Sequence, residues 1–323
     1  MKGVVSMPDL VAIGELLVDL TYINTPEGSA YKDNAGGAPA NVVCMAAKLG
    51  GSTGFIGKIG RDMFGFGLKD TLRHHGVDTK GLILDPNYST TLAFVKNSED
   101  GERDFVFYRA PEVSADLNIR YGEIDRGLID GCKVLYYGSL CLTSEPSKTA
   151  VLNAVEYAKN KGKLTAYDPN WRPMLWRDKQ AAMLTLRSAA QYADIIKVSE
   201  DELQLLTDTG TLVTAIAKLL NQGVKVICVT QGAKGCVVAT QKGIEIFPAY
   251  KTEIVDTLGA GDSFFGGFLY KLCSLGKSLE ELESDDIAQM AYLGNACGAL
   301  TSSKKGAIPA MPTPDEVRAL IRK

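Results

Sequence analysis

A glycine-rich segment leading into an apolar stretch is the part of this sequence best suited to chemistry. Gly259, Ala260, Gly261 and Asp262 stand directly before residues 263–275, which are predicted to form a helix. The free N–H groups and the dipole at a helix N-terminus bind anions, and glycine lets the backbone approach a phosphate closely. Asp262 is ionised at its ordinary pKa of about 3.9, and a helix N-terminus favours that charge further.

A carboxylate beside an anion-binding turn suits phosphoryl transfer. The amides would stabilise charge on the moving phosphoryl group, while Asp262 would orient a hydroxyl and accept its proton. A helix N-cap at a glycine turn gives the same local pattern without any chemistry. The segment alone therefore leaves a phosphate site and a helix cap equally open.

Two other glycine turns could contact ligands. Residues 230–235 follow an apolar strand predicted at 224–230, so they could pass under a nucleotide or turn tightly into the next strand, which the pattern favours. Residues 36–41 open a helix predicted at 39–49, and the side-chain amide of Asn41 could bond a sugar hydroxyl.

Composition argues against several classes of protein. The 323 residues carry 35 basic and 38 acidic side chains, a balance that gives no reason to expect nucleic acid or anionic lipid as a partner. The two histidines, His74 and His75, are adjacent at the end of a predicted helix. The sequence therefore offers almost no suitably placed histidine for a catalytic triad or a histidine-bound zinc. Gly57 and Lys58 lack the other residues of a P-loop, and the glycine fingerprint of dinucleotide sites is missing.

Cysteine usage and the N-terminus indicate a cytoplasmic protein. The seven cysteines are scattered without a C-x-x-C pair, and most stand in apolar stretches, as is typical of reduced core residues. No apolar segment has the length of a membrane span, and the first residues lack the apolar core of a signal peptide. We therefore expect a cytoplasmic enzyme or small-molecule binder with no membrane partner.

Short β-branched stretches alternate with helical patterns along most of the chain, which predicts a parallel sheet covered by helices on both faces. Ligands of such a sheet bind beyond the carboxyl ends of its strands. Besides the segments given above, strands are expected at Leu10–Ile13 and at residues 133–137, 164–167, 193–198 and 236–239, and helices at residues 148–161 and after 198.

Two regions interrupt this alternation. Residues 91–96 and Arg103–Tyr108 are rich in β-formers, and the turn residues 97–101 between them predict a hairpin. Residues 17–23 are expected to add a further strand to the same small sheet.

The whole chain, residues 1–323, is expected to form one domain with this small sheet inserted from segments at about 16–36 and 90–112. A sheet in that position could close over a site as a lid that excludes water. An ordinary surface hairpin would give the same pattern.

The order of these motifs resembles the ribokinase-like carbohydrate kinases, the PfkB family. Residues 256–262 are similar to the C-terminal signature of that family, and residues 36–41 followed by 57–65 are similar to the N-terminal one. Residues 14–19 and 167–172 are most similar to those of fructokinases. The resemblance covers nearly the whole chain. It implies an α/β fold, a three-layer αβα sandwich with a mostly parallel sheet, plus a small β-sheet lid.

The resemblance also implies an activity, namely transfer of the γ-phosphoryl group of ATP to the 6-hydroxyl of fructose. It implies Mg²⁺ with the nucleotide, a monovalent cation that is commonly K⁺, and a homodimer joined through the lids. A kinase for another sugar or sugar acid, such as ribose or 2-keto-3-deoxygluconate, is the nearest alternative. A non-catalytic sugar or nucleotide sensor has no need of Asp262, and a nicotinamide-dependent oxidoreductase would need the missing glycine fingerprint.

Residue roles follow from the resemblance, position by position. The base would be Asp262, with an anion hole made by the amides of Gly259, Ala260 and Gly261. The sugar would be held by Asp19, Gly36, Gly37, Asn41, Arg109 and Arg172. The nucleotide would be held by Lys197, Ser199, Thr230, Gly232, Gly235 and Asn295. Glu202 would bind Mg²⁺ through water, and the monovalent cation would lie at Asp256, Thr301 and Gly306. One departure is that Ser199 stands where the family often has Asn in an Asn-x-x-Glu motif.

Overall fold

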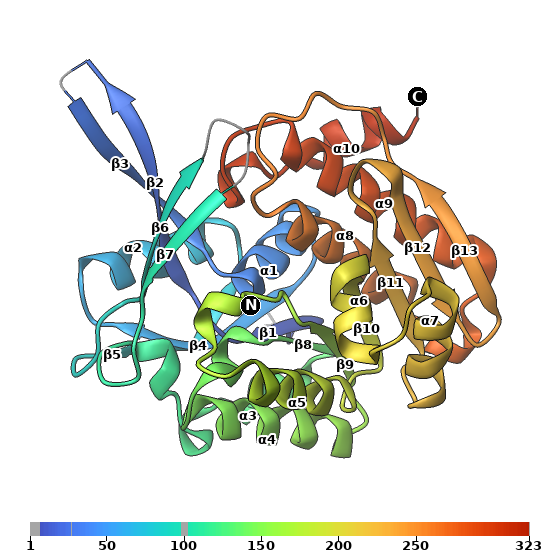
Figure 1. Cartoon of the computed structure of the whole chain (residues 1–323), viewed down its shortest axis with the longest axis horizontal. Coiled ribbons are helices and arrows are strands. Elements are labelled where there is room, and N and C mark those ends of the chain that lie inside the picture. The colour runs from blue at the N-terminus through green and yellow to red at the C-terminus, as the bar shows by residue number, and fades with distance from the viewer. Residues whose placement is uncertain (1–6, 27, 98–102, 323) are drawn as a thin grey trace, which may run out of the picture.

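The computed structural model describes residues 7–26, 28–97 and 103–322. A nine-stranded sheet with helices on both faces forms its centre, and a smaller four-stranded sheet projects from one side (Figure 1). Residues 98–101 of the predicted turn at 97–101 lie outside the described residues.

The large sheet has the strand order β13-β12-β11-β10-β9-β8-β1-β4-β5. All neighbours from β5 to β11 pair in parallel, while β12 and β13 form an antiparallel edge. The strands are β1 (Leu10–Ile13), β4 (Thr53–Gly60), β5 (Asp78–Asp85), β8 (Val134–Gly138), β9 (Leu164–Asp168), β10 (Ile195–Ser199), β11 (Val226–Thr230), β12 (Gly235–Thr240) and β13 (Gly243–Pro248).

Burial on both faces explains why these strands read as continuous apolar stretches. In β1, Leu10 and Ala12 belong to the core on one face, whereas Val11 and Ile13 belong to the core on the other. The first helical layer consists of α1 (Ala38–Lys48), α2 (Met63–His74), α8 (Ala260–Leu275), α9 (Ser284–Ser302) and α10 (Pro314–Ile321). The second consists of α3 (Arg126–Gly131), α4 (Ser147–Asn160), α5 (Lys179–Ala190), α6 (Glu200–Thr207) and α7 (Leu212–Asn221).

The small sheet has the order β3-β2-β6-β7, with β2 (Leu17–Thr25) paired in parallel to β6 (Leu92–Asn97). The hairpin partners are β3 (Gly28–Gly36) and β7 (Arg103–Tyr108). The register places Tyr22 opposite Tyr31 and Phe94 opposite Val106, so these side chains share one face of the sheet. We call that face, which also carries Tyr108, the outer face.

The sequence-based expectations for these elements are largely confirmed. The strand at Leu10–Ile13 has the expected bounds, the other predicted core strands agree within two residues, and α2 ends at His74. All seven cysteines are free and buried. The strands β4, β5 and β13 were not foreseen. In the part of the chain that is described, no helix has the length and apolarity that a membrane span requires.

Candidate active site

Four elements meet at the carboxyl edge of the large sheet. Asp168 ends β9, Lys197 lies near the end of β10, and the N-termini of α1 and α8 face the same edge with Asn41 and Asp262. The ends of parallel strands necessarily lie side by side, which is why residues far apart in sequence come together here.

Asp262 lies inside the first turn of α8, because the helix begins at Ala260, three residues earlier than predicted. Gly259 takes the N-cap position in a left-handed conformation with φ 72°, and no side chain caps the helix. A Cβ at Gly259 would lie 2.8 Å from the Cβ of Ala307, so a larger residue would not fit. The carboxylate of Asp262 is therefore not the helix cap, and its role as a base stays a prediction.

Asn41 holds the carboxylate of Asp262 across the site. Its Nδ2 donates to Oδ2 of Asp262 at 2.8 Å. Burial raises the pKa of Asp262 above its ordinary value, although Lys197, Asn41 and Arg172 each act to lower it. The expected net stabilisation of the charge by the helix N-terminus is thus outweighed by desolvation, and the carboxylate is more basic than a free aspartate.

The first-turn amides of α8 are only partly available to a ligand. The Ala260 amide donates to the carbonyl of Thr257 at 3.2 Å. The amides of Gly261 and Asp262 lie where no helical carbonyl can reach them, and no acceptor elsewhere in the described chain bonds them. A Cβ at Gly261 would lie 3.1 Å from Nζ of Lys197, so the ammonium group borders this turn. The predicted anion hole is therefore concentrated at Gly261, next to a cation.

Lys197 forms a buried ion pair with Asp168, with 2.8 Å between Nζ and Oδ2. Burial alone would lower the pKa of Lys197, but the carboxylates of Asp168, Glu202 and Asp262 outweigh it and raise the pKa. Asp168 was not among the predicted site residues. Its position as an acidic residue at the end of a buried strand was the available signal.

Arg172 connects the site to the small sheet. Its Nη1 donates to the carbonyl of Trp171 at 3.0 Å, and its guanidinium lies 5.9 Å from the ring centre of Phe105 in β7. Its charge acts to lower the pKa of Asp262. The structure therefore places Arg172 between the small sheet and the catalytic edge, where a sugar role remains a prediction.

The other predicted sugar residues lie where β2 and β3 join the core. A Cβ at Gly36 would overlap the carboxylate of Asp19, and a Cβ at Gly37 would lie 2.6 Å from the carbonyl oxygen of Glu15. Asp19 is buried, and its register partner Asn34 lies on β3. The glycines thus allow β3 to pass close to Asp19 on the way to Asn41.

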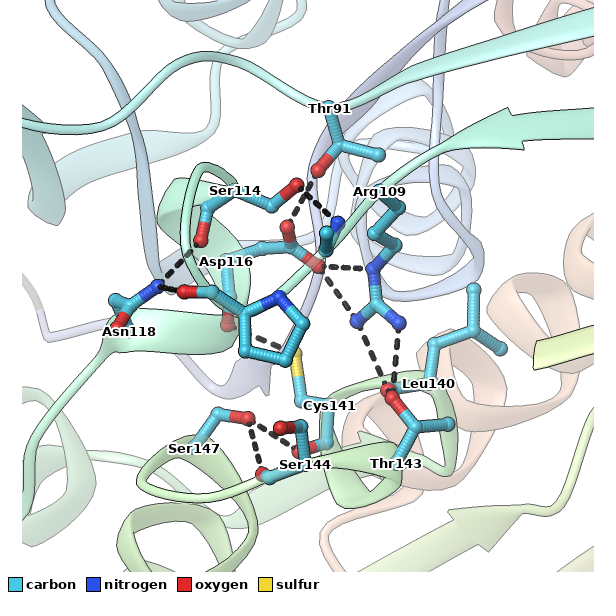
Figure 2. Close-up of polar contacts among 12 residues, drawn as sticks. Thr91, Arg109, Ser114, Asp116, Asn118, Leu140, Cys141, Thr143, Ser144 and Ser147 are labelled. Atoms are coloured by element: carbon cyan, nitrogen blue, oxygen red, sulfur yellow. Dashed lines mark hydrogen bonds and ion pairs between the residues drawn. The ribbon is translucent and has the colours of Figure 1, made fainter. Parts of the chain in front are cut away.

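Arg109 is held away from solvent by the protein itself (Figure 2). Its Nε and Nη2 contact Oδ2 of Asp116 at 2.8 and 2.7 Å. Its Nη1 donates to Thr143 and its Nη2 to the carbonyl of Leu140, both at 2.9 Å. The structure shows Arg109 as an anchor at the end of β7. Its role as a substrate ligand stays a prediction.

Ser199 and Glu202 form a reciprocal capping box at the start of α6. The amide of Glu202 donates to the Ser199 hydroxyl at 3.2 Å, and the amide of Ser199 donates to Oε2 of Glu202 at 2.8 Å. The S-x-x-E spacing was a signal for this cap that sequence reasoning passed over. Oε1 of Glu202 accepts from the Trp171 amide at 2.7 Å. Each oxygen keeps a further lone pair on a half-buried carboxylate, which fits contact with Mg²⁺ through water.

The other predicted nucleotide residues lie at the β11–β12 turn and on α9. Residues Gly232–Lys234 form the expected tight turn directly into β12, and their nucleotide role stays a prediction. A Cβ at Gly235 would overlap the carbonyl of Phe247. Thr230 donates to the carbonyl of Val198 at 3.3 Å. Asn295 donates to the carbonyls of Phe247 and Pro248 at 3.2 and 3.1 Å, which ties α9 to the end of β13.

The residues predicted to hold a monovalent cation surround the loop before α8. Asp256 accepts from the Leu258 amide at 3.0 Å and from the Gly306 amide at 2.8 Å. The Thr301 hydroxyl donates to Ser263 at 2.9 Å, and the Thr301 carbonyl accepts from Lys304. Asp256 therefore bonds Gly306 directly, and its own amide donates to the carbonyl of Ser302, the residue after Thr301. Whether the oxygen atoms of these residues hold a cation stays a prediction.

Comparison with known proteins gives the site its chemical class. Residues 7–314 match the family described as pfkB family carbohydrate kinase, so the protein is a sugar phosphotransferase. Its sequence is 41% identical over 320 residues to probable fructokinase-5 of Arabidopsis thaliana, covering 98% of each chain. The chain belongs to the pfkB family of carbohydrate kinases.

Solved structures agree with this assignment. A fructokinase from Xylella fastidiosa with bound ATP has a TM-score of 0.90 and 30% identity, covering 98% of this chain and 99% of that chain. A double mutant of a fructokinase from Vibrio cholerae O395, with fructose, ADP and a potassium ion bound, has a TM-score of 0.88 and 32% identity with the same coverage. The ribokinase-like fold expected from the sequence is confirmed.

Proposed function

We propose that this carbohydrate kinase transfers the γ-phosphoryl group of ATP to fructose, with Asp262 as the base. The observation that carries the proposal is the arrangement at the start of α8. There a carboxylate held by Asn41 lies in the same helical turn as the Gly261 amide and beside the Lys197 ammonium. The fructokinase names of the relatives and the sugar and nucleotides bound in the solved structures support this substrate pair.

In the proposed reaction, Asp262 accepts the proton of the attacking sugar hydroxyl while Asn41 fixes the orientation of its carboxylate. A raised pKa brings the carboxylate closer to the ideal for a general base at neutral pH. The Gly261 amide and Lys197 stabilise negative charge on the transferred phosphoryl group. Glu202 would hold Mg²⁺ through water, and Mg²⁺ would neutralise phosphate charge.

The small sheet serves as the lid in this proposal. Phe105 of its inner face lies near Arg172, and Asp19 lies where β2 leaves the core, so both are placed to act on a sugar bound between sheet and core. Closure of the small sheet over a bound sugar would exclude water from the site and so limit hydrolysis of ATP.

The test is an ATP-coupled assay over a panel of sugars with the parent protein and Asp262→Asn. We expect fructose to give the highest kcat/KM, and Asp262→Asn to lower kcat by about 10³-fold, within the usual range for loss of a general base. Asp285→Asn is a matched control, because Asp285 is an exposed aspartate in the first turn of α9.

Two results would contradict the proposal. Equal turnover by Asp262→Asn and the parent would remove Asp262 as the base. A higher kcat/KM with ribose or 2-keto-3-deoxygluconate than with fructose would mean that the same catalytic site acts on a different sugar.

We further propose that K⁺ binds at Asp256, Thr301 and Gly306, and that the protein is a cytoplasmic homodimer joined through its lids. The hydrogen bond that joins Gly306 to the Asp256 carboxylate and the potassium ion in the Vibrio cholerae structure support the cation. The exposed Tyr31, Val106 and Tyr108 on the outer face support the dimer. The cation proposal is tested by comparing activity in K⁺ buffer with activity in tetramethylammonium buffer. The mass of the protein in solution tests the dimer, and cell fractionation tests the location.

A further inference from the structure

Glu15 is a buried carboxyl group that the proposed reaction does not use. It lies between β1 and β2, is 1% exposed, and neither of its side-chain oxygens has a hydrogen-bond partner among the described residues. An ionised carboxylate in such a position would be very costly. Burial accordingly raises its pKa from the ordinary 4.5 to about 8.

The position of Glu15 is unusual because the chain enters the lid there and returns to the core beside its backbone. The chain enters the lid through Glu15 itself and returns at Gly37, whose Cβ position is 2.6 Å from the Glu15 carbonyl oxygen. The hairpin of β6 and β7 is anchored at both ends by one carboxylate, that of Asp116 (Figure 2). Thr91 donates to its Oδ1 at 2.5 Å, and Nε of Arg109 donates to its Oδ2 at 2.8 Å.

We call Thr91, Arg109 and Asp116 the lid root. The groups that act on Glu15 are Arg109 and Asp116 of this root, Asp262 of α8, Tyr136 of β8 and Cys141 beside the root. Arg109 is the single cation in that set. A negative charge on Glu15 would compete with Asp116 for Arg109 and would repel the negative charge on Asp262.

We propose that Glu15 is a positioning residue for the reaction, whose uncharged carboxyl group leaves Arg109 bound to Asp116 and leaves the negative charge to Asp262. In this role the protonation of Glu15 affects both the Arg109–Asp116 ion pair at the lid root and the negative charge on Asp262 at the catalytic edge. The activity arm of its test rests on the proposed kinase function, whereas the stability arm does not.

The experiment compares the parent with Glu15→Gln, which keeps the shape and the neutral state, and with Glu15→Ala. The parent kcat/KM is expected to fall as the pH rises through about 8, when Glu15 ionises. Glu15→Gln should remove that alkaline decline and keep kcat/KM at pH 7 within about threefold of the parent, while Glu15→Ala loses about tenfold or more. Glu156→Gln, on the exposed side of α4, is the matched control and should leave both profiles unchanged.

Thermal unfolding gives a readout that needs no substrate. The unfolded carboxyl ionises near pH 4.5 and the folded one near 8, so between these values the folded state binds more protons and its stability falls as the pH rises. The Tm advantage of Glu15→Gln over the parent should therefore widen from pH 5 to pH 8 and stop widening above pH 8. The Tm gap therefore reports whether Glu15 is uncharged in the folded protein, and the kcat/KM profile separates a positioning role from a merely structural one.

The proposal is overturned if Glu15→Gln keeps the alkaline decline of the parent, or if its Tm gap does not change between pH 5 and pH 8. Failure of Glu15→Gln to fold at pH 7 would also overturn it, because a neutral amide of the same shape should be accepted. If the parent phosphorylated no sugar, the proposed function would fail and the Tm gap would still decide the state of Glu15.

Discussion

Two buried ion pairs hold the two working regions of the molecule, and they are built in opposite ways. At the catalytic edge, Lys197 and Asp168 are 2.8 Å apart with side chains 9% and 0% exposed. At the lid root, Arg109 and Asp116 are 2.7 Å apart with side chains 2% and 1% exposed. Distance and burial therefore do not distinguish the two pairs.

The other contacts of Arg109 and Lys197 distinguish the two ion pairs. Arg109 uses its planar set of donors on Asp116, Thr143 and Leu140, so the lid root is satisfied within the protein. Lys197 is a point charge facing the carboxylates of Asp168, Glu202 and Asp262, so the catalytic edge carries more negative than positive charge. Because the catalytic edge has an excess of negative charge, it suits a substrate that binds together with a cation. The lid root, whose donors are all bonded within the protein, suits a fixed anchor that does not exchange partners.

Lys197→Met should produce the largest change in stability. It leaves Asp168 buried without its cation, which we expect to lower the free energy of unfolding by about 3–5 kcal/mol at pH 7.5. The loss should be smaller at pH 5, because burial raises the pKa of Asp168 to about 6 and a protonated Asp168 needs no partner. Urea denaturation at the two pH values measures both effects.

Lys225→Met is the control for that change, since Lys225 pairs with Glu280 in an exposed position and should lose no more than about 1 kcal/mol. An equally small loss for both variants would mean that the catalytic edge does not depend on its cation.

Asp116→Asn should have a smaller but more selective effect. Asn keeps an oxygen acceptor for Thr91 or Arg109 but removes the negative charge, so we expect a loss of roughly 3 kcal/mol and a several-fold higher fructose KM. Urea denaturation measures the loss of stability, and steady-state kinetics measures the change in fructose KM. Asp315→Asn removes an exposed partner of Arg318 and serves as the comparison. An unchanged fructose KM would show that the lid root does not position the lid.

Val106→Asp should have the smallest effect on stability, below about 1 kcal/mol, because Val106 is 57% exposed on the outer face. Its expected consequence is a halving of the mass in light scattering. Ile246→Asp on β13, where Ile246 is 73% exposed, should leave the mass unchanged. A parent that is already monomeric would contradict the proposed lid-to-lid dimer.

Composition explains why β1 and β11 were predicted from the sequence and β4 was not. β1 is apolar throughout, and β11 is apolar up to its last residue, Thr230, so the burial of both strands could be predicted. β4 reads TGFIGKIG, and its glycines looked like part of a signature rather than a strand. The structure shows the cause, because a Cβ at Gly57 would lie 2.6 Å from the ring of Phe55 and 2.7 Å from the carbonyl of Gly14. Such close packing depends on tertiary neighbours that a single sequence does not reveal.

The candidate site shows the same division. Local chemistry pointed to both Asp262 and Asn41, but their hydrogen bond joins residues 221 positions apart. The burial of Glu15 and the contacts of Asp116 with Thr91 and Arg109 arise from the fold, and no sequence spacing encodes them. The residue types were therefore readable, whereas the partners of each charge required the fold.

The burial of all seven cysteines suits this protein to site-specific thiol labelling. Burial raises the pKa of Cys44, Cys132, Cys236, Cys273 and Cys297 to about 12, and those of Cys141 and Cys228 rise well above the ordinary value. Thiolate is the reactive form, so all seven should resist maleimides at neutral pH. A single cysteine introduced on the outer face would carry a fluorophore without background, so that the lid could be followed in the otherwise unaltered chain.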